Sequence, residues 1–201
     1  MIRLLIATTV LLYTTEAFAP TVYTQKNFIT MEDYMNEIDY RAKLAIQEEE
    51  DKNRIINTLH NFIKSTIDKK RYDKEQADLI ATSIYTASKK YKLNPFLVGA
   101  MCYEESDPKW YKDCVSPKGA RGLMQIMPVW DGHLFVYLDI KQADIFNIKE
   151  NIMAGCHILR EYLDMGGDDL NWALNKYSGG GGETYVSKVR SAMERIKEAM
   201  K

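Results

Sequence analysis

The strongest constraint on this chain is an apolar helix that ends in an acidic residue and is followed by a glycine-containing turn. Asn94-Pro95 marks the start of the helix, because asparagine caps a helix and proline fits its first position. Asp107-Pro108 ends it near Glu105, since the residue before proline is pushed out of the helical region. Residues 119–125 then read Gly-Ala-Arg-Gly-Leu-Met-Gln. This order predicts one carboxyl group facing backbone amides and an amide side chain across a groove.

The rest of the chain predicts a mainly α fold with at most a small β-ribbon in the middle. Apolar residues recur at helical spacing from Tyr72 onward, over 151–163, from the Asp168-Asp169 cap to Tyr177, and again from Tyr185. Residues 129–144 are expected to form a loop with aromatic content. The pattern divides the chain into residues 1–19, a helical N-terminal arm over 20–71 and a compact domain over 72–201.

Composition narrows the classes of function. The formal net charge of −1 favours neither a nucleic-acid partner nor a strongly acidic substrate. The three histidines and three cysteines are scattered along the chain, so no metal site and no cofactor are expected. Cys102 and Cys114 flank Glu105, and two interpretations remain open: a disulfide between them, or small buried thiols throughout.

The N-terminus has the pattern of an export signal. Arg3 supplies a positive charge, residues 4–13 form an apolar core, and Ala17-Phe18-Ala19 resembles a cleavage site. Pro20 disfavours cleavage after Ala19, so cleavage after Ala17 and retention as an anchor both remain open. The expected location is the periplasm or cell envelope.

Several short motifs together identify a resemblance over residues 72–190. In this order and spacing the chain is similar to the catalytic domain of the soluble lytic transglycosylases, a lysozyme-like fold related to goose-type lysozyme. The matching elements are Asn94-Pro95, Glu105-Ser106, Ser116-Pro117, Gly119-Ala120, the run from Gly122 to Pro128, Asn151 with Gly155, Ala173-Leu174, Tyr177 and Tyr185-Val186.

The resemblance implies that Glu105 is a single general acid and base that cleaves peptidoglycan strands at the MurNAc-GlcNAc β-1,4 bond. The substrate acetamido group would assist, and attack by the C6 hydroxyl would leave a 1,6-anhydro end, which makes the enzyme a lyase. Glu104 is the neighbouring alternative, but adjacent helical residues point about 100° apart, so only one of the two can face a groove. The acids that a hydrolase could use as a second carboxylate are Asp107, Asp113, Asp131 and Asp139, and none stands at a position that assigns it.

The substrate-binding residues also follow from the resemblance. Gln125 would bind the sugar N-acetyl group, Met124 would pack against the ring, and Ser106 and Ser116 would line the groove. The Tyr177 hydroxyl would hydrogen-bond Glu105. Ser178 stands where the family usually has asparagine, which removes an amide donor from this side of the groove.

Two alternatives to a lytic transglycosylase stay open. One is a lysozyme-type hydrolase of the same fold, and the other is a non-catalytic component that binds the cell wall. The helical arm over residues 20–71 is a candidate docking segment for a secretion apparatus, a pilus or a phage assembly. The sequence does not choose among these settings.

Overall fold

The computed structural model describes residues 31–106 and 109–200 of the chain. The predicted export signal or anchor lies outside these residues. The chain forms two compact units, and the boundary between them lies between Lys52 and Asn53. None of the helices formed by the described residues combines the length and hydrophobicity that a membrane span requires.

Helix α2 (Met31–Thr66) is continuous. In the first unit, residues 31–52 are mostly exposed and carry ion pairs at i,i+4 spacing, such as Glu37–Arg41 at 2.6 Å. From Asn53 onward the helix belongs to the second unit, where Leu59, Phe62 and Ile63 are buried. These three apolar residues belong to the core of the second unit.

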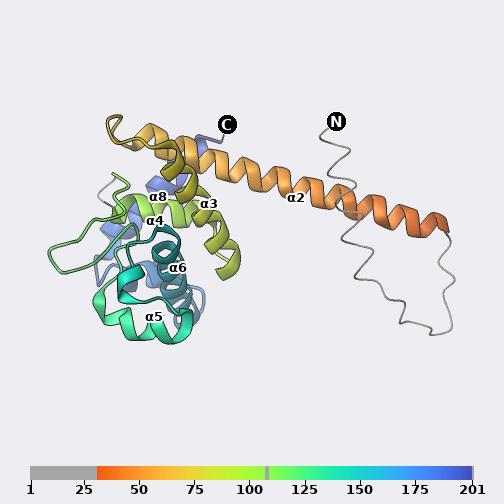
Figure 1. The fold of residues 1–201 in the computed structure, drawn as a ribbon. Coiled ribbons are helices and arrows are strands. Elements are labelled where there is room, and N and C mark those ends of the chain that lie inside the picture. Colours follow the sequence, from red (N-terminus) through yellow and green to blue (C-terminus); the bar gives the residue numbers. More distant parts are fainter. Residues whose placement is uncertain (1–30, 107–108, 201) are drawn as a thin grey trace. The chain divides into compact units, whose positions relative to one another are not determined.

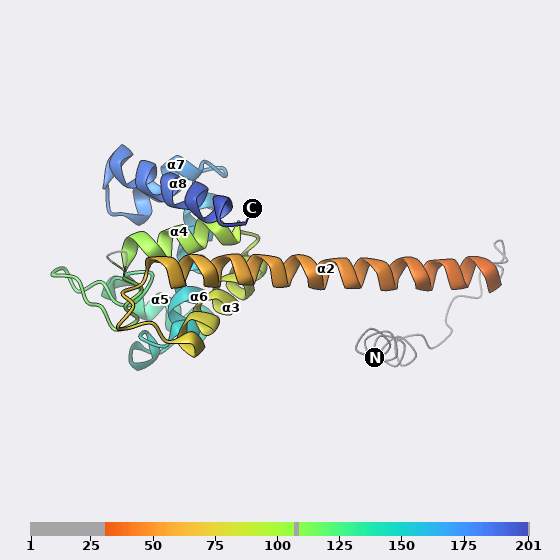
Figure 2. The same cartoon turned by 90° about the horizontal axis from the view of Figure 1, so that it is seen from above.

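The second unit is a ring of packed helices. Its elements are α3 (Lys74–Tyr91), α4 (Pro95–Glu105), α6 (Ile148–Met165), α7 (Leu170–Tyr177) and α8 (Gly182–Glu198). Helix α4 packs against α3 and α8, α3 against α6, α6 against α7, and α7 against α8, which closes the ring (Figures 1 and 2). The mainly α, lysozyme-like prediction is confirmed.

Helix α4 is buried around nearly its whole circumference. Every residue from Leu97 to Tyr103 is buried, which is expected of a helix that is apolar on all faces. The predicted cap is confirmed, because the Asn94 side chain accepts a hydrogen bond from the Phe96 N–H and Pro95 occupies the first turn. The core therefore holds the helix that presents Glu105 at its last turn.

The middle of the chain differs from the prediction in one respect. Residues 129–144 are not a loop throughout: Pro128–Trp130 and Gln142–Asp144 form 3₁₀ turns, and Asp131–Leu138 forms helix α5. Helix α5 has no side-chain cap, and Leu134 is its one buried residue, so it lacks the start signal and the apolar stripe by which a helix is recognised in sequence. Within the described residues, extended pairing is limited to the isolated bridges of Arg121 with Val115 and with Ile126.

Cys102 and Cys114 do not form the disulfide considered above. Cys102 is a buried thiol whose Sγ lies 3.1 Å from Met124 Sδ. The Cys114 thiol instead donates to the Gly122 carbonyl, at 3.2 Å. Cys102 is thus a core residue, whereas Cys114 is only partly buried.

Candidate active site

Glu105 is placed by the end of α4. It is the last helical residue, and Ser106 forms the C-cap with its N–H bonded to the Cys102 carbonyl. The Ser106 side chain is fully buried, and its hydroxyl accepts the Trp110 N–H at 3.1 Å. Ser106 therefore fixes the chain that leaves the helix, and its burial does not fit the predicted contact with substrate.

The partner of Glu105 is Tyr185 from α8. The Tyr185 hydroxyl donates to Glu105 Oε1 at 2.5 Å. The prediction that Tyr177 makes this bond is wrong, because the Tyr177 hydroxyl donates to the Met124 carbonyl at 2.8 Å. The two tyrosines thus have separate tasks: one holds the carboxyl group, and the other holds the loop that follows.

Burial raises the pKa of Glu105 from 4.5 to about 7. The hydrogen bond from Tyr185 lowers this pKa and the nearby Glu104 carboxylate raises it, but both effects are smaller than that of burial. Burial also raises the pKa values of Cys102, Tyr177 and Tyr185, and the charge of Glu105 adds to each of these shifts. Glu105 therefore lies beside neutral thiol and phenol groups and one carboxylate, and is about half protonated near neutral pH.

Glu104 has different surroundings. Partial burial raises its pKa, and the cations Lys188 and Arg195 lower it. The net shift of the Glu104 pKa is still upward, but positive charge on α8 opposes it, whereas no described cation contributes to the pKa of Glu105. Of the two adjacent acids, Glu105 has the environment that a neutral acid requires.

Met124 forms part of the core rather than the surface. Its side chain is fully buried, and a Cβ on Gly155 of α6 would come within 2.5 Å of it, so only glycine fits there. This burial contradicts the predicted packing of Met124 against a sugar ring. A methionine in a loop can fill either a gap in the core or a binding groove, and the close approach of α6 selects the first.

Asn151 of α6 holds the loop that contains Met124. It is 1% exposed, and its carboxamide accepts from the Met124 N–H at 2.8 Å and donates to the carbonyls of Arg121 and Ile145 at 3.0 and 2.8 Å. Gly122, with a φ of +75°, lies directly against this carboxamide, where a Cβ would come within 2.3 Å of Nδ2. One buried amide thus satisfies three backbone groups and fixes the loop beside α4.

Gln125 lies at the edge of this loop with a left-handed φ of 48°. Its Nε2 donates to the Gly122 carbonyl at 2.9 Å and lies 3.0 Å from Cys114 Sγ. The amide nitrogen is therefore bound within the loop, which leaves the carbonyl end of the side chain as the part available to a ligand.

The two predicted serine contacts are engaged in turns. The Ser116 hydroxyl accepts the Ala120 N–H at 3.0 Å. The Ser178 hydroxyl donates to the Asn175 carbonyl at 2.9 Å and accepts the Gly181 N–H at 2.8 Å, where it closes the turn after α7. Both side chains are partly buried and stabilise the loops around the site.

None of the described candidates for a second carboxylate contributes to the pKa of Glu105. Asp113 pairs with Lys112 at 3.0 Å, Asp131 pairs with the buried Arg121, and Asp139 caps α5 in a left-handed conformation. Asp107 lies outside the described residues. Each of these three aspartates therefore has a local partner or a local role in the backbone.

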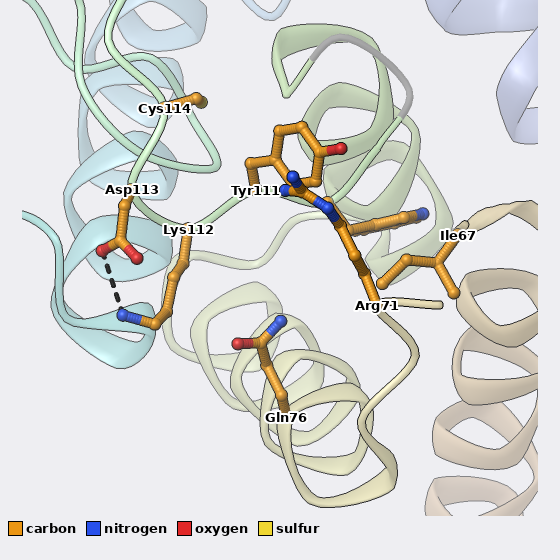
Figure 3. A pocket seen from close by; sticks show the side chains of 8 residues that line it. Ile67, Arg71, Gln76, Tyr111, Lys112, Asp113 and Cys114 are labelled. Carbon is orange, nitrogen blue, oxygen red and sulfur yellow. Dashed lines mark hydrogen bonds and ion pairs between the residues drawn. The ribbon is translucent and has the colours of Figure 1, made fainter. Parts of the chain in front are cut away.

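A cavity of about 360 Å³ lies where the chain after α2 meets the start of α3 and residues 110–114 (Figure 3). The Arg71 guanidinium stacks on the Tyr111 ring at 4.5 Å, with Gln76 across from it. Glu105 does not line this cavity, but Cys114, which contacts the Gln125 amide, does. The cavity is thus a neighbour of the Gln125 loop rather than the place of the acid.

Sequence reasoning missed two features. Tyr185 was recognised as a motif residue, but its hydrogen bond to Glu105 depends on the packing of α8 against α4, which spacing alone does not give. The other feature is a group formed by His133, His157 and Glu161, the one set of metal-ligating side chains found together in the described part of the chain. It lies on α5 and α6, which carry neither Glu105 nor Tyr185.

Comparison with known proteins identifies the family of this domain. Residues 82–200 match the family model described as the transglycosylase SLT domain. A transglycosylase of Enterobacteria phage PRD1 is 38% identical over 100 residues, covering 49% of this chain and 34% of the phage protein. The chain thus matches about a third of that relative's length.

Two lytic transglycosylases are among the solved structures to which this chain is similar. An inactive mutant of Slt from Pseudomonas aeruginosa matches at a TM-score of 0.45 and 17% identity, covering 58% of this chain and 22% of that one. The 70 kDa soluble lytic transglycosylase of Escherichia coli matches at 0.41 and 21%, covering 66% and 29%. At these scores the likeness adds no argument to the family match over residues 82–200.

Proposed function

Because the chain belongs to the transglycosylase SLT domain family, we propose that it is a lytic transglycosylase that cleaves peptidoglycan strands at the MurNAc-GlcNAc β-1,4 bond. The observation that carries the proposal is Glu105 itself: a partly buried carboxyl group with a pKa of about 7 and a hydrogen bond from Tyr185. Such a group can give a proton and take one back at the same pH.

Glu105 would act first as an acid. Its proton passes to the glycosidic oxygen, and the bond from that oxygen to C1 of MurNAc breaks while the oxygen of the substrate's acetamido group bonds to C1. The Tyr185 hydroxyl stabilises the carboxylate that forms, since it already donates to Oε1.

Glu105 would then act as a base. The carboxylate accepts the proton of the C6 hydroxyl, O6 bonds to C1, and the bond from the acetamido oxygen to C1 breaks. The product is a 1,6-anhydro ring, no water is consumed, and Glu105 is protonated again. This sequence needs one carboxyl group rather than the two that most glycosidases use.

A hydrolase of the same fold is the second candidate, and the environment of Glu105 argues against it. Glu104 is the one described carboxylate that contributes to the pKa of Glu105, and its own charge interacts with the cations Lys188 and Arg195. No described carboxylate that influences Glu105 is therefore free to act as the second acid of a hydrolase.

Action on peptidoglycan would take place outside the cytoplasmic membrane, in agreement with the export signal expected over residues 1–19.

The products of digestion test the proposal. Isolated peptidoglycan incubated with the full chain should release fragments that end in 1,6-anhydro-MurNAc, detected by mass spectrometry as a mass lower by one water than the reducing sugar. Reducing MurNAc ends would support the hydrolase instead. Intact peptidoglycan would support a non-catalytic wall-binding component.

Tyr185→Phe tests the link between the tyrosine and the acid. Loss of a hydrogen bond to a charged group costs about 1.5–3 kcal/mol, so we expect the cleavage rate to fall by roughly 10- to 100-fold. The bond lowers the pKa of Glu105, so its loss should raise that pKa and move the alkaline limb of the pH–rate profile to higher pH.

Tyr177→Phe is the matched control for this variant. It removes a hydroxyl of the same kind from the Met124 carbonyl rather than from Glu105. It should leave the alkaline limb where it is, even if the rate falls. Equal displacement of the limb in both variants, or in neither, would show that Tyr185 does not position the acid.

A further inference from the structure

Two histidines far apart in the sequence meet a glutamate on one face of α6. His157 and Glu161 are four residues apart on that helix, which places them on the same side, and His133 reaches them from α5. The His133 and His157 Nε2 atoms lie 3.1 Å apart. Glu161 Oε1 lies 2.9 Å from His133 Nε2 and 3.5 Å from His157 Nε2.

These distances suit a shared metal ion. Ligands held about 2.0–2.1 Å from Zn²⁺ in tetrahedral geometry lie roughly 3.3 Å from one another. The three measured separations fall on either side of that value. The side chains are also partly shielded, with exposures of 28% for His133, 15% for His157 and 25% for Glu161.

The three ligand atoms can all present lone pairs to one region. Nε2 of a neutral imidazole is either a donor or an acceptor, and the two facing nitrogens and the carboxylate oxygen converge on one another. In the tautomers in which both Nε2 atoms are acceptors, three lone pairs share that space and repel one another. A divalent metal ion bound there would remove this repulsion.

Aromatic rings lie beside both imidazoles. The rings of Tyr137 and Trp130 lie beside His133, with centroids 4.4 and 5.3 Å away, and the Tyr91 ring lies beside His157. These contacts restrict the rotation of the two imidazoles, so that both nitrogens stay directed at the same region.

We propose that His133, His157 and Glu161 bind one divalent transition-metal ion of the zinc class, with its fourth position open to water. Two imidazoles and one carboxylate are a ligand set that Zn²⁺ accepts. The ion would join α5 to α6. Helix α5 needs such a link, because it has no side-chain cap and buries only Leu134. The expectation of no metal site rested on the scatter of the histidines in sequence, and the fold brings two of them together.

Zinc binding to the full chain tests the site. Protein stripped with a chelator and desalted should bind one Zn²⁺ per chain in calorimetry, and its unfolding temperature should rise on zinc addition. Co²⁺ in place of zinc should give the visible absorption of a tetrahedral site.

Loss of a residue that only supports a metal ligand weakens metal binding by ~10- to 100-fold. His133→Ala and Glu161→Gln each remove a ligand, so each should weaken zinc binding by at least that factor and should remove the rise in unfolding temperature. His60→Gln is the matched control, because it removes the third histidine of the chain and leaves the cluster intact. It should bind zinc like the unaltered protein.

Two results would overturn the site: no stoichiometric binding by the unaltered protein, or affinity unchanged in both ligand variants. The site does not depend on the proposed enzyme activity. Stripped protein should still cleave peptidoglycan at moderate temperature, since the reaction at Glu105 uses no metal. Lost cleavage after stripping, restored by zinc, would contradict the metal-free mechanism but not the metal site.

Discussion

Glu105→Gln is expected to abolish peptidoglycan cleavage and to make the protein more stable above neutral pH. The amide cannot give or take a proton, and general acid–base catalysis contributes about 10²–10⁴-fold to a rate. A fall of at least that size should appear in the release of soluble fragments from isolated peptidoglycan. The fold should remain, because glutamine can still accept the hydrogen bond from Tyr185.

The effect on stability follows from the pKa. Glu105 has a pKa of about 7 in the folded state and about 4.5 when unfolded, so the folded protein holds the extra proton between these values. The free energy of unfolding must therefore fall as the pH rises from 4.5 to 7, by about 3 kcal/mol at most. Glutamine does not titrate, so the variant should match the unaltered protein near pH 4 and exceed its stability at pH 8.

Glu104→Gln is the matched control, because it alters the adjacent acid on the same turn of α4. Its carboxylate faces Lys188 and Arg195, so the variant should keep most of the cleavage activity. Near-normal activity in Glu105→Gln together with inactivity in Glu104→Gln would show that the catalytic acid is Glu104 rather than Glu105.

Asn151→Asp is expected to cause the largest loss of stability among single substitutions of similar volume. The carboxylate keeps an acceptor for the Met124 N–H but turns an oxygen toward the carbonyls of Arg121 and Ile145. A buried polar group left unsatisfied costs about 1–3 kcal/mol, and this change affects two carbonyls and buries a charge. We expect a loss of roughly 3–5 kcal/mol, measured by denaturant unfolding near pH 7.

Asn151→Asp should also lower the rate of peptidoglycan cleavage, because the loop that contains Met124 packs beside α4. Asn171→Asp provides the control: its Oδ1 accepts a hydrogen bond from Arg190 at an exposed position, and an aspartate would keep that bond. Its stability should change by less than about 0.5 kcal/mol. Equal effects from both substitutions would show that the buried carboxamide has no special part in holding the loop.

The helices that carry the site could be predicted because their signals are local. Asn94 caps α4 and Asp169 caps α7 as expected, and glycines follow the end of α6. The end of α4 at Glu105 follows from the proline two residues beyond Ser106. A cap or a proline acts on its own turn, so the residue identities are sufficient.

The partners within the site could not be predicted in this way. Tyr177 and Tyr185 are both tyrosines near the C-terminal end of the chain, and only the crossing of α8 over α4 decides which one reaches Glu105. Met124 was expected at the surface, but α6 approaches so closely at Gly155 that the side chain is enclosed. These outcomes depend on distances between helices, which a single sequence does not encode locally.

Helix α5 and the His133–His157–Glu161 group show the same limit. Without a cap or an apolar stripe, α5 resembles a loop in sequence, and the separation of 24 positions between the two histidines conceals their contact. The role of Glu105 in catalysis remains a prediction that rests on its burial and on the family match.

A direct titration of the Glu105 carboxyl group tests the central proposal. Protein labelled with ¹³C at glutamate side-chain carboxyls can be followed by NMR from pH 4 to pH 9, with Glu105→Gln used to assign the signal. Desolvation, which outweighs the hydrogen bond from Tyr185 and the charge of Glu104, predicts a midpoint of about 7. A midpoint near the ordinary value of 4.5 would mean that Glu105 is ionised at neutral pH, and it would contradict its action as a general acid.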